Sequence, residues 1–215
     1  MNRLRLALVL LACALTTPAI AETSLSLGGG ISFDKHEFQG MGSGPHYSLT
    51  GQGGTAFIEV TRHNALTVAG RPVAASLSLH RDAPSAVDTA SDGRAWAASL
   101  DRGAQIRTTR TLVTLSTPVV QQGNWSLDLG VGVGLARTDV TLRHGTATTH
   151  QRETLPHAAL SLRAARASAD GRARVWSELR YHTSPALTLT FDDGEQRRHE
   201  ISGLELAAGV TFFIE

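Results

Sequence analysis

His182 and Ser184 are the side chains with which this chain could perform covalent chemistry. They stand two residues apart in the segment His182-Thr-Ser-Pro-Ala186, and Glu195 follows in the next acidic stretch. Residues two apart in a strand point to the same face, so the imidazole and the hydroxyl would lie together. A serine nucleophile needs a neighbouring base, and the base needs a carboxylate that orients it. The spacing therefore indicates a candidate base, nucleophile and orienting group.

Other motifs that resemble functional sites have simpler structural explanations. Gly28-Gly-Gly30 and the glycines of 130–134 lie within strand patterns and do not open a helix, which argues against a phosphate-binding loop. His144 and His150 offer two metal ligands without a third nearby, so we expect no metal and no other cofactor. The net charge of +1 is dispersed along the chain, and this dispersal predicts no nucleic-acid partner.

Long amphipathic strands are the elements that must position these side chains. Over the C-terminal segment 204–215, every even position is apolar, whereas the odd positions are mostly polar or small. Successive strand side chains alternate between faces, so this segment has one apolar face. A membrane crossing takes about 9–11 residues of tilted strand, whereas soluble strands run to about 5–6. The length therefore favours a transmembrane strand.

The segment Trp125–Leu135 shows the same alternation, with large apolar residues at odd positions and Ser126, Asp128 and three glycines between them. In a soluble sandwich the large residues would face inward. In a membrane barrel they would face lipid, and the small and polar residues would fill a narrow lumen. This strand alone leaves both possibilities open.

On several strands, charged residues occupy the face opposite the large apolar residues, and this pattern favours a membrane barrel over a soluble sandwich. They comprise four acids and four arginines. Inside a closed barrel these groups would have to pair across the lumen, each arginine with a carboxylate. The expected interior is a charge network that closes the lumen to solutes. Its predicted members are Glu59, Arg110, Asp128, Arg163, Arg174, Glu178, Arg180 and Glu205.

The period-2 segments predict eight strands joined alternately by short and long connections. The strands are expected at about 23–34, 53–62, 73–81, 105–120, 124–141, 152–168, 172–191 and 198–214. Short turns are expected at 121–124 and 169–171, and long loops at 34–52, 81–94, 143–151 and 184–197. The stretch 95–104 leaves a ten-stranded barrel open as an alternative.

Six histidines fall in or beside the expected loops. We expect them to be solvated, although imidazole and arginine side chains in loops also suit the phosphates and sugars of lipopolysaccharide. These residues are His36, His46, His80, His144, His150 and His199.

The N-terminus carries a targeting pattern. Two early arginines precede an apolar run over 6–15, and Ala19-Ile-Ala21 precedes Glu22. This pattern predicts a secretory signal peptide over residues 1–21. The single cysteine, Cys13, lies within the segment and leaves a lipoprotein cleavage site as an alternative. Cleavage after Ala21 would leave a chain without disulfides.

The C-terminal residues resemble the last hairpin of small outer-membrane β-barrels of the OmpA-like and opacity-type porin family. The resemblance rests on Ser177-Glu-Leu-Arg-Tyr181, Phe191-Asp-Asp-Gly194 and the closing segment 206–213. It implies an eight-stranded barrel whose outer loops serve adhesion or other surface interactions. Such families end on an aromatic residue that the barrel-assembly machinery reads. Here Glu215 follows the aromatic pair, so the assembly signal departs by one or two positions.

The His182-x-Ser184 pair also resembles the motif of outer-membrane lipid A deacylases, which continue it with an asparagine. Pro185 stands at that position and offers neither a side-chain amide nor a backbone N–H to an oxyanion. The strand phase directs His182 inward, whereas such an enzyme needs a site that lipid can reach.

The sequence as a whole predicts an all-β protein of the outer membrane of a Gram-negative bacterium. Residues 22–215 are expected to form an eight-stranded antiparallel up-and-down transmembrane barrel with a structural, adhesive or surface-interaction role and no enzymatic activity. The expected partners are outer-membrane lipid and lipopolysaccharide, the barrel-assembly machinery and an extracellular partner of the loops. The alternatives are a lipid A acyl hydrolase that uses His182, Ser184 and Glu195, and a soluble periplasmic barrel that binds a lipid or small ligand.

Overall fold

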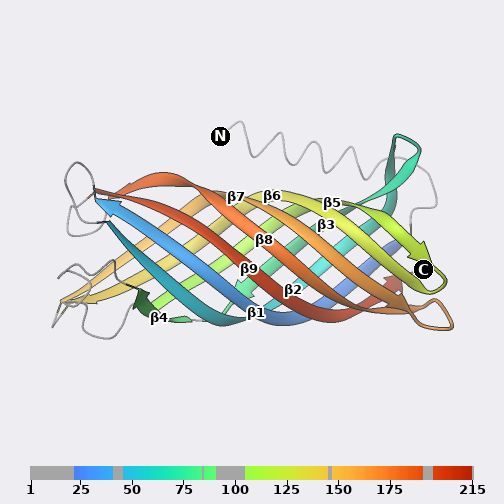
Figure 1. The fold of residues 1–215 in the computed structure, drawn as a ribbon, viewed down its shortest axis with the longest axis horizontal. Helices are drawn as coiled ribbons and strands as arrows, with labels where there is room; N and C mark the ends of the chain where they lie inside the picture. Colours follow the sequence, from blue (N-terminus) through green and yellow to red (C-terminus); the bar gives the residue numbers. More distant parts are fainter. Residues whose placement is uncertain are drawn as a thin grey trace.

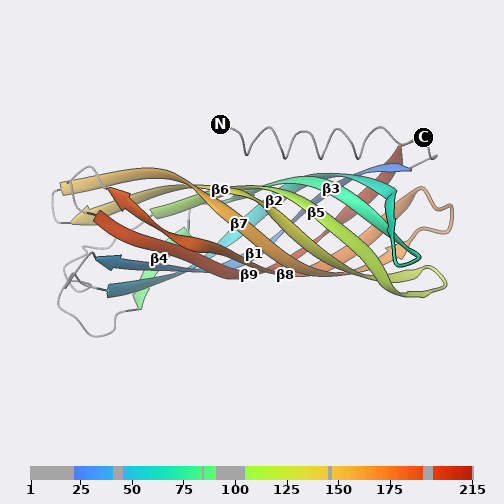
Figure 2. The same ribbon diagram turned by 90° about the horizontal axis from the view of Figure 1, so that it is seen from above.

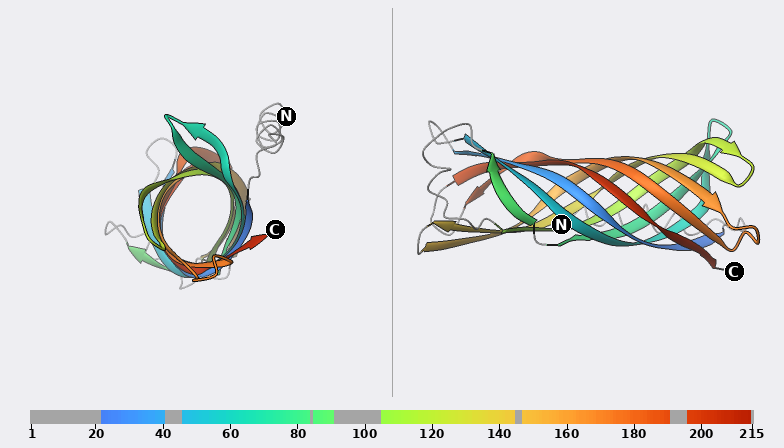
Figure 3. Two further views of the ribbon diagram at one scale, coloured as in Figure 1. Left: turned by 90° about the vertical axis from the view of Figure 1, so that its right-hand side faces the viewer. Right: turned by 60° about the horizontal axis from the view of Figure 1, so that its bottom comes forward.

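Antiparallel strands make up all the elements that the described residues form. The structure is a computed structural model and describes residues 22–40, 46–83, 85–90, 105–144, 147–190 and 196–214, so the predicted signal peptide lies outside the described part. The sheet closes because β1 pairs with both β2 and β9, and Figures 1 to 3 show the resulting barrel from the side and end on. The strands are β1 (Thr23–Gly40), β2 (His46–Val68), β3 (Arg71–Asp82), β4 (Ser85–Ala90), β5 (Gln105–Gln122), β6 (Trp125–His144), β7 (Ala147–Ala167), β8 (Ala173–Thr190) and β9 (Gln196–Ile214).

The barrel has eight strands because β3 and β4 together form one wall strand. Both pair with β2 on one side and with β5 on the other. Between them, the Ala83 N–H donates to the carbonyl of Gly54 at 2.7 Å, which keeps the wall continuous. The predicted eight-stranded antiparallel barrel is confirmed. The stretch 95–104, on which the ten-stranded alternative rested, lies outside the described residues.

The pairing register sets the tilt of the strands. A path of paired residues that leaves β1 at residue 25 returns to β1 at residue 35, which is a stagger of ten residues. With about 3.3 Å per residue and about 4.8 Å between strands, this stagger tilts the strands by about 40°. An eight-stranded ring of this kind is just wide enough for its own side chains. The path runs through Leu25, Val60, Leu77, Val113, Val133, Ala158, Thr183, Ser202 and Lys35.

Tight turns close the end of the barrel at which both β1 begins and β9 ends. Ala69 and Gly70 have φ values of 49° and 76° in a turn that we did not predict, and Gly123 and Gly171 have φ values of 58° and 71° in the two that we did. Glycine adopts such values without the cost that a Cβ imposes. In the last turn, Ser168 Oγ donates to Asp170 Oδ1 at 2.5 Å, and this hydrogen bond lowers the pKa of the Asp170 carboxyl.

The strands run much farther toward the other end than the sequence indicated. We predicted loops at 34–52, 81–94, 143–151 and 184–197, but most of these residues belong to β1, β2, β4, β6, β7, β8 and β9. The prediction was wrong because it followed the apolar alternation. That alternation ends where the wall leaves the hydrocarbon, whereas backbone pairing continues beyond it.

The two faces of the wall have opposite chemistry. Val131 and Val133 point outward with 61% and 66% of their surface exposed, and outward leucines, isoleucines and valines recur on every long strand. Charged and hydroxyl side chains on the alternate positions are buried inside. The outward face therefore provides the apolar band that a lipid bilayer requires. Among the described residues, no helix has the length and apolar character to cross a membrane.

Paired aromatic rings fill part of the lumen where glycines make room for them. Phe57 and Trp176 lie with ring centroids 5.1 Å apart and are both buried. A Cβ on Gly28 would come within 2.7 Å of both rings, and one on Gly209 would come within 2.4 Å of Trp176. These two glycines therefore leave the space in which the rings approach the backbone of β1 and β9.

Val131→Arg tests which face meets lipid. The cost of burying an arginine at the middle of the apolar band is about 2–4 kcal/mol and falls toward zero near the interface. We therefore expect Val131→Arg to lower the free energy of unfolding by about that amount in lipid vesicles. Thr154→Arg, which lies outward on β7 beyond the band, is the matched control and is expected to have little effect. Equal losses from both variants would contradict the proposed orientation.

Candidate functional site

Two arginines and three glutamates form a continuous ion-paired network inside the barrel. Arg163 Nη1 lies 2.6 Å from Glu59 Oε1, and Arg163 Nε lies 2.6 Å from Glu178 Oε2. Arg180 also pairs with Glu178 and lies 3.8 Å from Glu205. Because these residues come from β2, β7, β8 and β9, the network crosses the lumen and joins opposite walls.

A second set of charges lies next to the first. Arg110 Nη2 is 2.5 Å from Asp82 Oδ1 and 3.2 Å from Glu205 Oε2. Arg180 Nη1 is 2.6 Å from the Nε2 atom of His80, and His80 Nδ1 is 3.4 Å from Glu205 Oε1. Glu205 therefore meets basic side chains from three strands. This cluster is almost completely enclosed, because Arg110, His80 and Glu205 are each at most 2% exposed.

Six of the eight predicted interior charges take part in these ion pairs. The other two, Asp128 and Arg174, face the lumen without an ion pair within the described part of the chain. Asp128 accepts a hydrogen bond from Ser126 at 3.3 Å, and the Arg174 guanidinium lies 4.7 Å from the ring centroid of Phe213. We did not predict Asp82, because it fell in a segment that we expected to be a loop.

The expectation of solvated loop histidines was wrong for three residues. His36, His80 and His199 are at most 1% exposed, whereas His150 is exposed and the side chains of His46 and His144 lie outside the described set. His36 Nδ1 lies 3.1 Å from His199 Nε2, and His199 pairs with Glu153. The period-2 pattern gave a usable signal, because Ser32, Asp34 and His36 continue the inward phase of β1.

The candidate acyl-ester residues lie in the same interior but with a different partner. Ser184 Oγ lies 2.9 Å from Nδ1 of His157, a residue that sequence reasoning did not select. His182 instead lies 3.0 Å from Asp34 Oδ1 through Nε2. The rings of His157 and His182 lie 5.1 Å apart. Glu195, the expected orienting carboxylate, falls outside the described residues.

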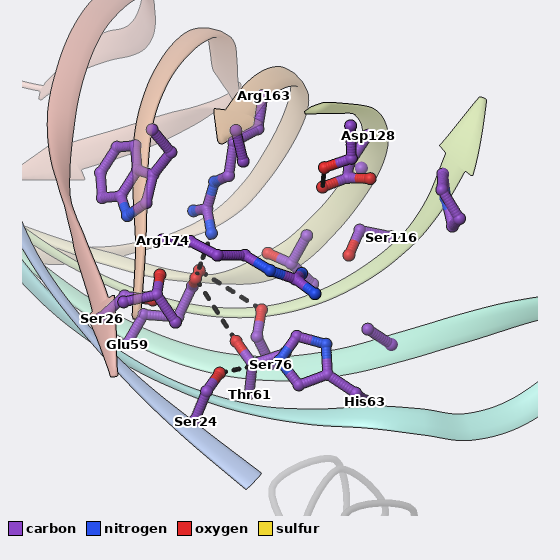
Figure 4. A pocket seen from close by; sticks show the side chains of 18 of the residues that line it. Ser24, Ser26, Glu59, Thr61, His63, Ser76, Ser116, Asp128, Arg163 and Arg174 are labelled. Carbon is purple, nitrogen blue, oxygen red and sulfur yellow. Dashed lines mark hydrogen bonds and ion pairs between the residues drawn. The ribbon is translucent and has the colours of Figure 1, made fainter. Parts of the chain in front are cut away.

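A water-accessible vestibule opens beneath the charge network at the end with tight turns. Its cavity has a volume of about 230 Å³, and its lining includes Glu59, Asp128, Arg163 and Arg174. Figure 4 shows these four residues around the cavity, with Thr61 and Ser76 directed at the Glu59 carboxylate. Mixed charge and hydroxyl groups suit water rather than an apolar ligand. Within the described ranges, no group of three or more His, Cys, Asp or Glu residues is arranged to hold a metal ion.

Arg163→Ala tests the energetic role of the network. Removing this cation leaves Glu59 as a buried charge without an arginine partner and leaves Glu178 paired with Arg180 alone, and breaking a buried pair costs about 3–5 kcal/mol. We expect that decrease in the free energy of unfolding, measured in lipid vesicles by heat-modifiable gel migration. Arg166→Ala removes a guanidinium three residues away that lies outward, 5.5 Å from the Trp125 ring, and is expected to cost about 1 kcal/mol or less. Comparable losses from the two variants would show that the lumen pairs are not important for stability.

Comparisons with known proteins identify the fold. No protein-family model and no curated protein matches the sequence. Neisserial surface protein A is similar in structure with a TM-score of 0.51 and 9% identity, covering 88% of this chain and 96% of that one. A major outer-membrane protein of Thermus thermophilus has a TM-score of 0.52 and 12% identity, covering 86% and 99%. The outer-membrane protein AlkL has a TM-score of 0.52 and 14% identity, covering 93% and 96%. This chain therefore has the fold of small eight-stranded β-barrels of the bacterial outer membrane.

Proposed function

We propose that this protein is a non-conducting barrel of the outer membrane that acts through its outer surface and outer end. The observation that carries this proposal is the ion-paired network across the lumen. Arg163, Arg180 and Arg110 connect four carboxylates from different walls, and all of these groups are buried except Arg163, whose side chain is 18% exposed and lines the vestibule. Solutes would have to break several charge-assisted contacts to pass.

The outer surface has a basic patch immediately beyond the apolar band. On β3 and β6 the outward residues change from Leu79 to Arg81 and from Leu135 to Arg137. Arg81 and Arg137 are both register partners of Thr109 on β5, so the three side chains form one row across the wall. All three lie on the outward face.

A second row extends this basic patch by two further arginines. Arg107 and Arg152 are both register partners of Asp139, and Arg152 forms an ion pair with Asp139. Across the residues that the structure describes, Arg81, Arg107 and Arg137 make no ion pair. The basic patch thus holds four arginines and one acid at the height where lipid headgroups begin. Arginine binds phosphate by paired, charge-assisted hydrogen bonds.

The phosphates of lipopolysaccharide are therefore the proposed ligand of the basic patch. Such contacts would fix the height and rotation of the barrel in the outer leaflet. The interaction role itself is proposed for the far end of the barrel, where the wall rises beyond the band to Gly40, Ala90, His144 and Thr190. An extracellular partner would meet the connecting segments there.

The proposed closure of the lumen predicts an absence of conductance. Refolded protein inserted into a planar lipid bilayer in concentrated KCl should give no stable current steps, because the charge network fills the cross-section. A general porin measured in the same bilayer provides the positive control. Reproducible unitary steps from the heat-modifiable, folded protein would refute the non-conducting interior.

The basic patch predicts that lipopolysaccharide binding depends on three particular arginines. Each basic residue near an anionic membrane surface contributes about 1 kcal/mol, so changing Arg81, Arg107 and Arg137 together to Gln should weaken binding by roughly a hundredfold. Binding can be measured by titrating lipopolysaccharide into the protein in neutral detergent at fixed salt. The matched control changes the exposed Arg71, Arg166 and Arg172 near the opposite end to Gln. A similar loss in the control would indicate general charge attraction rather than the basic patch.

A further inference from the structure

The wall between β7 and β8 stops pairing before either strand ends. Their register runs from Ala167 opposite Arg174 to Ala158 opposite Thr183. Beyond that point β7 continues through its described residues to 147 and β8 to 190, each paired on its other side only. In Figure 1 the outer part of β7 stays beside β6, the outer part of β8 stays beside β9, and the two pairs diverge.

Two prolines explain why the ladder stops here. Continuing the same register by two residues would place Pro156 opposite Pro185. Proline has no backbone N–H, so neither residue can donate a hydrogen bond across the seam. The register between β8 and β9 also shifts between Ser184 and Leu187, which bends β8 at the same place.

A groove occupies this interrupted seam on the lipid-facing side of the wall. Its volume is about 640 Å³, and outward residues such as Val133, Ala158 and Pro185 line it. Its lining also includes His157 and Ser184, whose side chains are buried on the inner side of the wall. The seam therefore places the buried Ser–His pair directly behind a gap in the backbone ladder, so a lipid would reach the pair through the wall where β7 and β8 separate.

The Ser–His pair has the geometry of a nucleophile and its base. Ser184 Oγ is 2.9 Å from His157 Nδ1, a distance at which an unprotonated Nδ1 accepts the hydroxyl proton. His157 Nε2 has no hydrogen-bond partner among the described atoms. The imidazole lies 5.1 Å from the His182 ring and has no orienting carboxylate among the described residues, so the pair is a dyad of nucleophile and base rather than a triad.

The groove lies at the height where acyl esters of membrane lipids are found. Its lower lining is apolar, with Val133 and Ala158, and Arg198 and Glu200 line its upper part. The change from apolar to charged residues marks the boundary between hydrocarbon and headgroups, and ester groups lie at that boundary. Arg198 provides a cation on the headgroup side.

We propose that the seam between β7 and β8 is a lipid-accessible site that cleaves an acyl ester of an outer-leaflet lipid, with Ser184 as nucleophile and His157 as general base. In the first step, His157 Nδ1 takes the Ser184 proton while Oγ bonds to the ester carbonyl carbon. The ester C–O bond then breaks, and the leaving alcohol takes the proton from His157. Water, deprotonated by the same imidazole, hydrolyses the acyl-serine to release a carboxylic acid and restore Ser184.

A lipophilic fluorophosphonate tests the nucleophile without requiring a known substrate. The folded wild-type protein in lipid vesicles should gain one covalent adduct, and peptide mass spectrometry should place it on Ser184. His157→Gln should slow labelling by at least about a hundredfold, because the general base is lost. Heat-modifiable migration of each sample shows that the barrel is folded.

Ser78 provides the internal control for this experiment. It is as buried as Ser184, and its Oγ lies 3.1 Å from His80 Nε2, but β3 is paired on both sides at that position. Labelling of Ser184 and not of Ser78 would support the open seam. Equal labelling of both serines, or no adduct on Ser184 in folded wild-type protein, would overturn the proposal and leave the Ser184–His157 contact as a structural clasp.

Supplying one lipid at a time shows which class of ester the site cleaves. Wild-type protein and Ser184→Ala are incubated with vesicles that contain either lipopolysaccharide or glycerophospholipid, and released fatty acid is measured by mass spectrometry. Release in the first vesicles alone assigns the site to acyl groups of lipopolysaccharide, and release in the second assigns it to glycerophospholipid. Release that is unchanged in Ser184→Ala, or no release from either vesicle, would contradict ester cleavage at this serine.

Discussion

The barrel depends on pairing the cations of a narrow lumen with carboxylates. An isolated charge in such surroundings would cost several kcal/mol, so arginine and glutamate are tolerated inside only as partners. Arg163 forms ion pairs with glutamates on two different strands, and Glu205 forms ion pairs with Arg110 and Arg180. Since the partners come from opposite walls, the same contacts hold the ring together and leave little open cross-section. The contacts that stabilise the ring are thus the same contacts on which the proposed closure of the lumen rests.

Contact with lipid determines which residue types face outward over only part of the wall. Within the apolar band, the outward face must be hydrophobic and the inward face carries the polar groups. Beyond the band, the outward face becomes charged, as in the step from Leu135 to Arg137, yet the backbone ladder continues because each strand still needs partners for its N–H and C=O groups. The barrel therefore rises above the hydrocarbon, and its inner surface there is rich in histidine, with His36 and His199 in contact.

The seam between β7 and β8 differs from the other seams because the chain places Pro156 and Pro185 where the ladder would bring them together. A closed barrel avoids exposed edges, so an interrupted seam at the lipid boundary is energetically costly. The side-chain contact between Ser184 and His157 bridges the seam where backbone pairing has ended. The Ser184–His157 contact would have the same geometry whether it only stabilises the seam or also reacts with an ester. Access of lipid to the two side chains distinguishes these two roles.

The amino-acid sequence by itself determined the strand period and the phase of the faces and favoured eight wall strands, because alternation of apolar and polar residues follows directly from strand geometry. It also indicated the inward direction of residues such as Glu59 and Arg163. Only the tertiary structure decided which charges meet, because partners such as Arg163 and Glu59 are separated by 104 positions in the chain. It alone paired Ser184 with His157 rather than with His182, because register between neighbouring strands, and not distance along one strand, sets which side chains come into contact.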